Sequence, residues 1–280
     1  MAQWPIDENR REDTVVGQIQ EKIAIGLLGL VNGYPTYATG KEVLQELLRK
    51  LHPVTTDKSL IRLGPPGDGG YLVPDDLAGI EACFSPGVAA CSDFEKDCAQ
   101  RGMSVFLADR SVEAPAIMHP KFHFIKKFIG ASTTDGFITM DDWVASSLSG
   151  TQSELILQMD IEGYEYETFL SMSNQLLQRF RIIIVEFHDL PRLWSLPYFS
   201  LASHVFEKIL QSHACVHLHP NNACGSIVKD GIEMPRIMEF TFLRKDRIAR
   251  SSSATVFPHP LDGDNVKGSA LPLPKCWYRV

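Results

Sequence analysis

The sequence predicts an α/β protein built on a doubly wound, mostly parallel sheet. From residue 80 onward, short apolar runs alternate with stretches of helical periodicity, which is the pattern of βαβ units. The run 182–187 stays apolar almost to its end, as expected for a strand that helices cover on both faces. The chain has 280 residues, with 44% hydrophobic and 22% charged side chains, so it is typical of a folded globular protein.

Seven runs predict strands and four stretches predict helices. The strands are expected at residues 81–85, 104–108, 122–129, 155–159, 182–187, 215–218 and 239–243. The helices are expected at residues 92–100, 140–147, 164–179 and 201–212. A loop with Pro220, Asn221, Asn222 and Gly225 joins the last two strands in place of a helix. This predicts an antiparallel hairpin, and hence an antiparallel edge strand, on a seven-stranded sheet.

Two flanking segments are expected beside the main domain, which we place at residues 61–250. Residues 1–60 predict an N-terminal helical extension, with helices at 15–30 and 41–51, the second having a clear apolar face. Residues 251–280 contain Pro258, Pro260, Pro272 and Pro274 and predict an irregular tail that packs on the domain.

Composition and charge exclude several classes of protein. The net charge of −7, with no long basic run, argues against a dedicated nucleic-acid binder. The first residues lack the apolar region of a secretory signal, and the longest early apolar run, 23–31, is too short to span a membrane. The six cysteines lack metal-binding spacing and are expected to be reduced, so a cytoplasmic location is expected. The oligomeric state is not encoded in these patterns.

The segments after the first two sheet strands predict a nucleoside site. Gly87 lies in a turn after the first strand, and Ser92 with Glu95 predicts a capping box at the next helix. The turn lacks the G-x-G-x-x-G pattern, which disfavours a dinucleotide pyrophosphate. Asp109 ends the second strand and can accept hydrogen bonds from ribose hydroxyls. Together these features favour an adenosyl group without phosphates, hence S-adenosylmethionine; a tight turn with a surface Asp is the alternative.

Acidic and imidazole side chains follow three later strands. Asp160, Glu162 and Glu165 follow the strand 155–159, and Glu165 also fits a plain helix-start acid. The next strand ends with three polar residues, and another carries two histidines; these five are Glu186, His188, Asp189, His217 and His219. Ligands bind beyond the carboxyl ends of the strands in such sheets, so we expect these groups to meet at one rim.

Two chemistries fit this rim, and the sequence does not decide between them. In one, a general base removes a proton from a substrate hydroxyl, with His188 as the first choice. In the other, a divalent cation, Mg²⁺ or Mn²⁺, activates the hydroxyl. The candidate ligands of that cation are Asp160, Glu186, His188, Asp189 and His219.

The run 157–165, Leu-Gln-Met-Asp-Ile-Glu-Gly-Tyr-Glu, closely resembles the K-x-D-x-E-G-x-E signature of FkbM-type methyltransferases, with Gln158 in place of the usual Lys. Other segments with the same resemblance are 68–71, 85–88, 94–95, Asp109, 186–188 and 217–222. The resemblance spans roughly residues 64–245. It implies a Rossmann-like class I methyltransferase fold and an S-adenosylmethionine-dependent O-methyltransferase. The acceptor it implies is a hydroxyl of a sugar, a glycoconjugate or a polyketide-like natural product.

The same resemblance implies roles for individual residues. Asp68, Gly69 and Gly70 would lie near the methionine part of the cofactor, although Gly69-Gly70 also fits a plain surface turn. Ser85, Pro86 and Gly87 would contact the cofactor, and Asp109 its ribose. Asp160 and Glu162 would face the methyl-transfer centre. Together with the rim chemistry above, this makes Asp160, Glu186 and His188 the expected catalytic residues.

Two other functions are weighed against this one. A nicotinamide-dependent oxidoreductase could use a similar sheet, but it would need the absent glycine pattern. A non-catalytic binding protein on a methyltransferase scaffold would be expected to lose Gly87 or Asp109, and both are present. Residues 191–198 are a candidate lid. Trp143, Trp194, Tyr198 and Phe199 are either an aromatic wall for a carbohydrate or small-molecule acceptor or part of the core.

Overall fold

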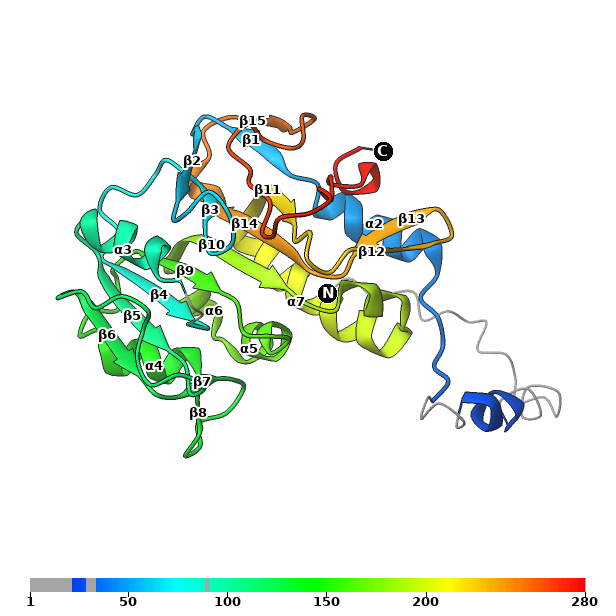
Figure 1. Ribbon diagram of the computed structural model, residues 1–280, viewed down its shortest axis with the longest axis horizontal. Helices are drawn as coiled ribbons and strands as arrows, with labels where there is room; N and C mark the ends of the chain where they lie inside the picture. Colours follow the sequence, from blue (N-terminus) through cyan, green and yellow to red (C-terminus); the bar gives the residue numbers. More distant parts are fainter. Residues whose placement is uncertain (1–21, 29–33, 89–90, 280) are drawn as a thin grey trace.

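The structure is a computed structural model that describes residues 22–28, 34–88 and 91–279. A seven-stranded sheet runs through its centre, with strands in the order β11-β14-β10-β9-β4-β5-β6 (Figure 1). Its strands are β4 (Ala82–Pro86), β5 (Ser104–Ala108), β6 (Phe122–Ile125), β9 (Leu155–Met159), β10 (Phe180–Phe187), β11 (His213–Pro220) and β14 (Met238–Arg244). The predicted α/β class and the doubly wound, mostly parallel sheet are confirmed.

The hairpin at one end of the sheet is formed by β11 and β14, as expected, but the antiparallel strand is not the outermost one. Strand β14 pairs antiparallel with both β10 and β11, so it lies one place in from the edge and β11 runs parallel to β10. The helix before β11 crosses over so that β11 lies two positions from β10 in the sheet. Strand β14 then returns in the opposite direction and occupies the position between them. A short hairpin, β12 (Ser226–Lys229) with β13 (Ile232–Pro235), occupies the connection.

The two faces of the sheet are covered differently. One face packs against α2 (Lys41–Lys50), α4 (Met140–Ser147), α5 (Glu165–Ser171), α6 (Asn174–Leu177) and α7 (Leu196–Ser212). The other face packs against α3 (Asp93–Gln100) and the hairpin of β2 (Leu60–Leu63) and β3 (Tyr71–Pro74). Successive residues of β9 alternate between these two cores, with Leu155 and Leu157 in one and Ile156 in the other. This alternation explains why the central strands are apolar throughout.

Two predicted elements are each divided in the structure. The expected strand 122–129 becomes β6 and β7 (Phe128–Ile129), and β7 leaves the sheet to pair with β8 (Phe137–Ile138). The expected helix 164–179 becomes α5 and α6. The break falls at Ser173, whose hydroxyl accepts a hydrogen bond from the backbone N–H of Leu176 and so caps the new helix.

The predicted capping box at α3 is wrong. Ser92 stands at the N-cap position, but its side chain makes no capping hydrogen bond. Glu95 turns inward and accepts a hydrogen bond from the Ser85 hydroxyl at 2.5 Å. The carboxyl group of Glu95 is therefore bonded to the β4 strand, and not to the end of the helix as the local pattern predicted.

The flanking segments take part in the core. Helix α2 is confirmed, and residues 22–28 are helical, whereas 15–21 and 29–30 of the expected first helix lie outside the described residues. The extension and the tail are not purely helical and irregular, because β1 (Val54–Thr56) pairs with β15 (Ser251–Ser253). Trp277 of η3 (Lys275–Trp277) is fully buried with its ring 5.9 Å from that of Phe240. The domain boundaries at 60 and 250 stay predictions.

Among the helices that the structure describes, none combines the length and the apolar character that crossing a bilayer requires.

A backbone contact joins the carboxyl ends of β4 and β9. Gly87 has φ +88°, and a Cβ atom at this position would lie 1.6 Å from the carbonyl oxygen of Asp160. The backbone N–H of Asp160 donates to the carbonyl oxygen of Pro86 at 3.3 Å. Gly87 does permit a close approach, as the sequence predicts, and the group that approaches is the backbone of Asp160. The turn after β4 and the acidic turn after β9 are thereby fixed against each other.

Gly87→Ala is expected to lower the free energy of unfolding by at least about 2 kcal/mol, because Ala would combine an unfavourable φ with overlap onto a backbone oxygen. Chemical denaturation followed by circular dichroism would measure this. Gly150→Ala is the control, since nothing lies within 4 Å of its Cβ position and its φ is not positive. Equal stability of the two variants would contradict the account of this contact.

Candidate functional site

His188 lies at the centre of an acidic cluster at the carboxyl ends of β9 and β10. Its Nε2 atom is 3.8 Å from Oδ1 of Asp160, 3.4 Å from Oε2 of Glu162 and 3.8 Å from Oε1 of Glu186. Asp160 follows β9 and Glu186 lies near the end of β10, so neighbouring strands bring the two carboxylates together. The structure thus places all three expected catalytic residues, Asp160, Glu186 and His188, side by side.

Glu165 holds the other side of the imidazole. Its Oε1 atom lies 3.0 Å from Nδ1 of His188 and also accepts the backbone N–H groups of Ile161 and Gly163 at 3.1 Å each. The Glu165 side chain is fully buried, and its Oε2 atom has no hydrogen-bond partner. A carboxylate at Nδ1 favours the proton on that nitrogen, which leaves Nε2 to face the other acids. The sequence also allowed Glu165 to be only an acid at the start of a helix. That interpretation does not account for its contact with His188.

The charges of this cluster shift the pKa values of its members strongly. Burial lowers the pKa of His188, but the Glu165 hydrogen bond and the charges of Glu165, Asp160 and Glu186 outweigh it and raise the pKa to about 9. Burial raises the pKa of Asp160 to about 6. Burial and the charge of Asp160 raise the pKa of Glu186 to about 8. Several acids therefore share one imidazole, so the cluster is short of positive charge.

The same groups form a candidate ligand set for a divalent cation. Asp160, Glu165 and His188 each offer one ligand atom within 4.8 Å of the other two. Oδ1 of Asp160 and Oε2 of Glu165 are buried without a hydrogen-bond partner, which is costly unless a ligand or cation satisfies them. Mixed carboxylate and imidazole donors suit Mg²⁺ or Mn²⁺, so the residues present fit such an ion.

Asp109 is fixed beside the Gly87 turn. Its Oδ2 atom accepts the backbone N–H of Val88 at 2.9 Å, and its Oδ1 atom accepts the backbone N–H and the hydroxyl of Ser111 at 2.7 Å each. The side chain is partly exposed, and a carboxylate has about four acceptor positions, so one remains for a ligand hydroxyl. This geometry fits the ribose-binding role that the sequence predicts, and it lies at the same rim as Asp160.

Ser85 lies inside the protein and not at the ligand surface. Its hydroxyl is completely buried, 2.5 Å from Oε1 of Glu95 and 2.6 Å from Oε1 of Gln158. The amide nitrogen of Gln158 donates to the hydroxyl of Tyr71 at 3.1 Å. Burial raises the pKa of Glu95, although the hydrogen bond that it accepts from Ser85 acts in the opposite direction. Gln158, where the motif usually has Lys, is thus hydrogen-bonded to both Ser85 and Tyr71 in the core.

Asp68, Gly69 and Gly70 lie in a loop whose backbone is held by one guanidinium group. Arg62 donates to the carbonyl oxygens of Pro65, Gly67 and Gly70 at 2.5, 2.8 and 2.9 Å. Gly69 has φ +75°, and its Cβ position lies 3.2 Å from Sγ of Cys91 in the segment after β4. The glycine-rich loop therefore lies against the region of the Gly87 turn, as a shared ligand site requires.

Two of the expected metal ligands are not brought into the cluster. Asp189 has φ +59°, is exposed, and pairs with Arg192 at 3.0 Å. His219 lies on β11 with its Nδ1 3.9 Å from Oδ2 of Asp262, and His217 lies 2.8 Å from the other oxygen of the same carboxylate. The strand β14, which separates β11 from β10, keeps these histidines away from His188.

The expected lid is fixed in place. Residues 190–194 form a 3₁₀ helix, η1 (Leu190–Trp194), and α7 starts at Leu196. Thr39 donates through its backbone N–H to Trp194 at 2.9 Å and through its hydroxyl to Leu193 at 2.7 Å. Of the expected aromatic wall, Trp143, Trp194 and Phe199 are buried in the core, and Tyr198 alone is partly exposed.

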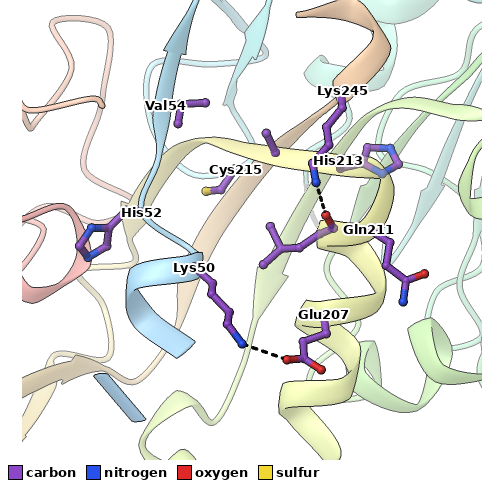
Figure 2. A pocket seen from close by; sticks show the side chains of 10 residues that line it. Lys50, His52, Val54, Glu207, Gln211, His213, Cys215 and Lys245 are labelled. Carbon is purple, nitrogen blue, oxygen red and sulfur yellow. Dashed lines mark hydrogen bonds and ion pairs between the residues drawn. The ribbon is translucent and has the colours of Figure 1, made fainter. Parts of the chain in front are cut away.

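A hollow of about 360 Å³ lies elsewhere on the molecule, between α2, α7 and the beginning of β11. Figure 2 shows Lys50 directed toward Glu207, with His213 and Cys215 above them in this view. His213 begins β11, whereas the acidic cluster lies where the parallel strands end. This hollow therefore belongs to the opposite edge of the sheet and not to the cluster around His188.

Comparison with known proteins gives one family match and distant structural likenesses. An E. coli prophage protein described as a DNA modification methyltransferase is 10% identical, with 60% of this chain and 47% of that chain covered and a TM-score of 0.39. A Pyrococcus horikoshii protein described as an RNA methyltransferase is 11% identical. The match covers 81% of this chain and 98% of that chain, with a TM-score of 0.32. An Anabaena variabilis protein described as a methyltransferase from an antibiotic biosynthesis pathway is 12% identical. The match covers 50% of this chain and 60% of that chain, with a TM-score of 0.26.

This chain spans about half the length of the first of these structures, and scores this low carry no argument about function. No curated protein matches the chain. The family model described as the methyltransferase FkbM domain matches residues 112–215, which contain Asp160, Glu186 and His188. The family resemblance inferred from the motifs is thereby confirmed over these residues.

Proposed function

We propose that this protein is an S-adenosylmethionine-dependent O-methyltransferase whose acceptor is a hydroxyl group of a sugar, a glycoconjugate or a polyketide-like natural product. The single observation that carries the proposal is the imidazole of His188, held at Nδ1 by Glu165 and presenting Nε2 beside Asp160. A hydroxyl must lose its proton as it is methylated, so O-methylation needs such a base or a cation at this position.

The roles of the chain's own residues follow from their positions. Asp109 would bind the ribose hydroxyls, and the Gly87 turn would set the nucleoside beside Asp160. When bound, S-adenosylmethionine supplies an activated methyl group on a sulfonium, which leaves as a neutral thioether. In its neutral form His188 would take the acceptor proton on Nε2, and Glu165 would stabilise the resulting imidazolium; because the pKa of His188 is about 9, this form is favoured only at alkaline pH or when a cation in the rim lowers that pKa. The protein otherwise aligns the acceptor oxygen with the methyl carbon, and alignment of this kind contributes much of the rate.

A divalent cation is the second way to activate the hydroxyl, and the unpaired oxygens of Asp160 and Glu165 favour it. Asp160, Glu165 and His188 would hold the ion, because each offers one ligand atom within 4.8 Å of the other two, and Glu186 lies beside them, 3.8 Å from Nε2 of His188. The ion would lower the pKa of the acceptor hydroxyl and offset the excess of acids. Asp189 and His219 are not part of this proposed site.

Other functions receive less support. A nicotinamide-dependent oxidoreductase lacks the glycine pattern, and a non-catalytic scaffold would have no need of a buried Glu165–His188 pair. The acceptor is proposed to be a small molecule or a carbohydrate, because the rim is acidic and would repel the phosphates of a nucleic acid.

Asp109→Ala is expected to weaken binding of S-adenosylhomocysteine about tenfold or more, because hydrogen bonds to a charged carboxylate contribute about 1.5–3 kcal/mol. Isothermal titration calorimetry would measure the affinity, with thermal melting to verify the fold. Glu113→Ala, an exposed acid that pairs with Lys126 in the following loop, is the matched control. Unchanged affinity in the Asp109 variant would count against the ribose assignment.

Glu165→Gln is expected to lower the pKa of His188 from about 9, because it removes a hydrogen bond and a nearby negative charge that both favour the imidazolium. NMR titration of the imidazole in protein freed of divalent cations would show the change, with protonation lost at lower pH than in the parent protein. Glu167→Gln, an exposed acid on the same helix, should leave the titration unchanged. A pKa that does not fall in the Glu165 variant would refute the proposed pairing.

Asp160→Asn is expected to reduce Mn²⁺ affinity at least tenfold, since it removes one charged ligand from the cluster. Electron paramagnetic resonance of free Mn²⁺ would measure binding. Asp189→Asn serves as the control, because that exposed acid pairs with Arg192 and should leave binding unchanged. If the parent protein binds no Mn²⁺, the route through a general base alone is favoured.

A further inference from the structure

The C-terminal strap, residues 259–266, is fixed against the glycine-rich loop. A Cβ atom on Gly263 would lie 1.9 Å from the carbonyl oxygen of Pro66, so the two backbones are in direct contact. Arg62, which holds the loop, also donates to the carbonyl oxygen of Leu261 at 3.1 Å. Asp262 accepts Nε2 of His217 at 2.8 Å, which ties the strap to β11. The strap and the loop therefore form one wall of the rim.

Asn265 extends from this strap to two carboxylates. Its Nδ2 atom donates to Oε1 of Glu239 at 3.0 Å and to Oδ1 of Asp68 at 3.4 Å. Its own Oδ1 atom is buried and makes no hydrogen bond, so these two contacts through Nδ2 are what orient the amide. Glu239 is buried on β14, directly opposite Glu186 of β10. The amide of Asn265 thus connects an exposed acid of the glycine-rich loop to the rigid sheet.

Asp68 lies near the acidic cluster around His188. It is exposed, and its charge acts on both Asp160 and Glu186. The backbone of its loop is held by Arg62, but a carboxylate on an exposed loop would still rotate freely without a side-chain partner. The ligand that this edge favours is a cationic group that can reach Asp68 while the rest of the molecule lies near Asp160.

We propose that Asn265 is a positioning residue that orients Asp68 toward the α-ammonium group of the cofactor, which makes the C-terminal strap part of the cofactor site. This inference rests on the proposed function, because the cofactor supplies the ammonium group. Asn265 lies outside residues 112–215, so it adds a determinant that the family match does not include. Because Asn265 already restricts rotation of the Asp68 side chain, less conformational entropy is lost when the ligand binds.

Calorimetry with two ligands tests the inference. S-adenosylhomocysteine carries the ammonium group, whereas 5′-methylthioadenosine shares the nucleoside and lacks the whole amino-acid chain. Asn265→Ala is expected to weaken S-adenosylhomocysteine binding about fivefold to tenfold and to change 5′-methylthioadenosine binding less than about twofold. In an Asp68→Ala background, Asn265→Ala should have no further effect on either ligand, because the residue acts through Asp68.

Asn222→Ala is the structural control. Asn222 hydrogen-bonds to the end of the strap at Val266 and to Ser269 just beyond it. Among the described residues no hydrogen bond joins it to Asp68, so its variant should bind both ligands as the parent does. Equal weakening of both ligands by Asn265→Ala, an equal loss in Asn222→Ala, or an additive loss with Asp68→Ala would each overturn the inference. If the parent protein binds neither ligand, the proposed function fails, and this inference falls with it.

Discussion

The contact between the Gly87 backbone and the Asp160 carbonyl is the constraint on which the rest of the site depends. It fixes the turn that follows β4 against the turn that follows β9, with no side chain between them. Asp109 then fixes the first turn through the N–H of Val88, and Glu165 fixes the second through two backbone N–H groups. The Gly87–Asp109 side and the acidic side of the rim are thereby held at a fixed distance, which side-chain motion cannot change.

The rim carries more acidic groups than basic ones, and this excess of negative charge determines its electrostatics. Asp160, Glu165 and Glu186 surround the single imidazole of His188, and burial makes each uncompensated charge costly. The raised pKa values of Asp160 and Glu186 express this cost. A cationic ligand or ion that enters the rim would relieve it, so binding and the readiness of His188 to accept a proton are coupled.

Much of the fold could be predicted from the sequence, because continuous apolar runs and helical periodicity survive in the buried centre of the sheet. Strands β5 and β9 and helix α4 have the predicted bounds. The errors fall where tertiary contacts override local pattern: Glu95 turns from the helix end to Ser85, and β14 inserts before the edge strand. Local spacing carries no information about either event.

The candidate site likewise contains residues that could be predicted from the sequence and residues that could not. Asp160, Glu186 and His188 could be found because the ends of adjacent strands must meet. His219 could not be excluded from sequence, because its separation from His188 depends on which strand lies between them. Asn265 follows no strand and belongs to no motif, and its approach to Asp68 and Glu239 depends on how an irregular segment crosses the sheet.

The anchoring of the chain on both sides of the strap limits what that segment can do. Ser251–Ser253 is paired in β15 on one side, and the indole of Trp277 is enclosed in the core on the other. The intervening residues form a closed span that can bulge but cannot swing away as a free end could. Lengthening such a span costs little entropy. Insertions between residues 266 and 272 are therefore expected to be tolerated, with the strands on both sides left unchanged.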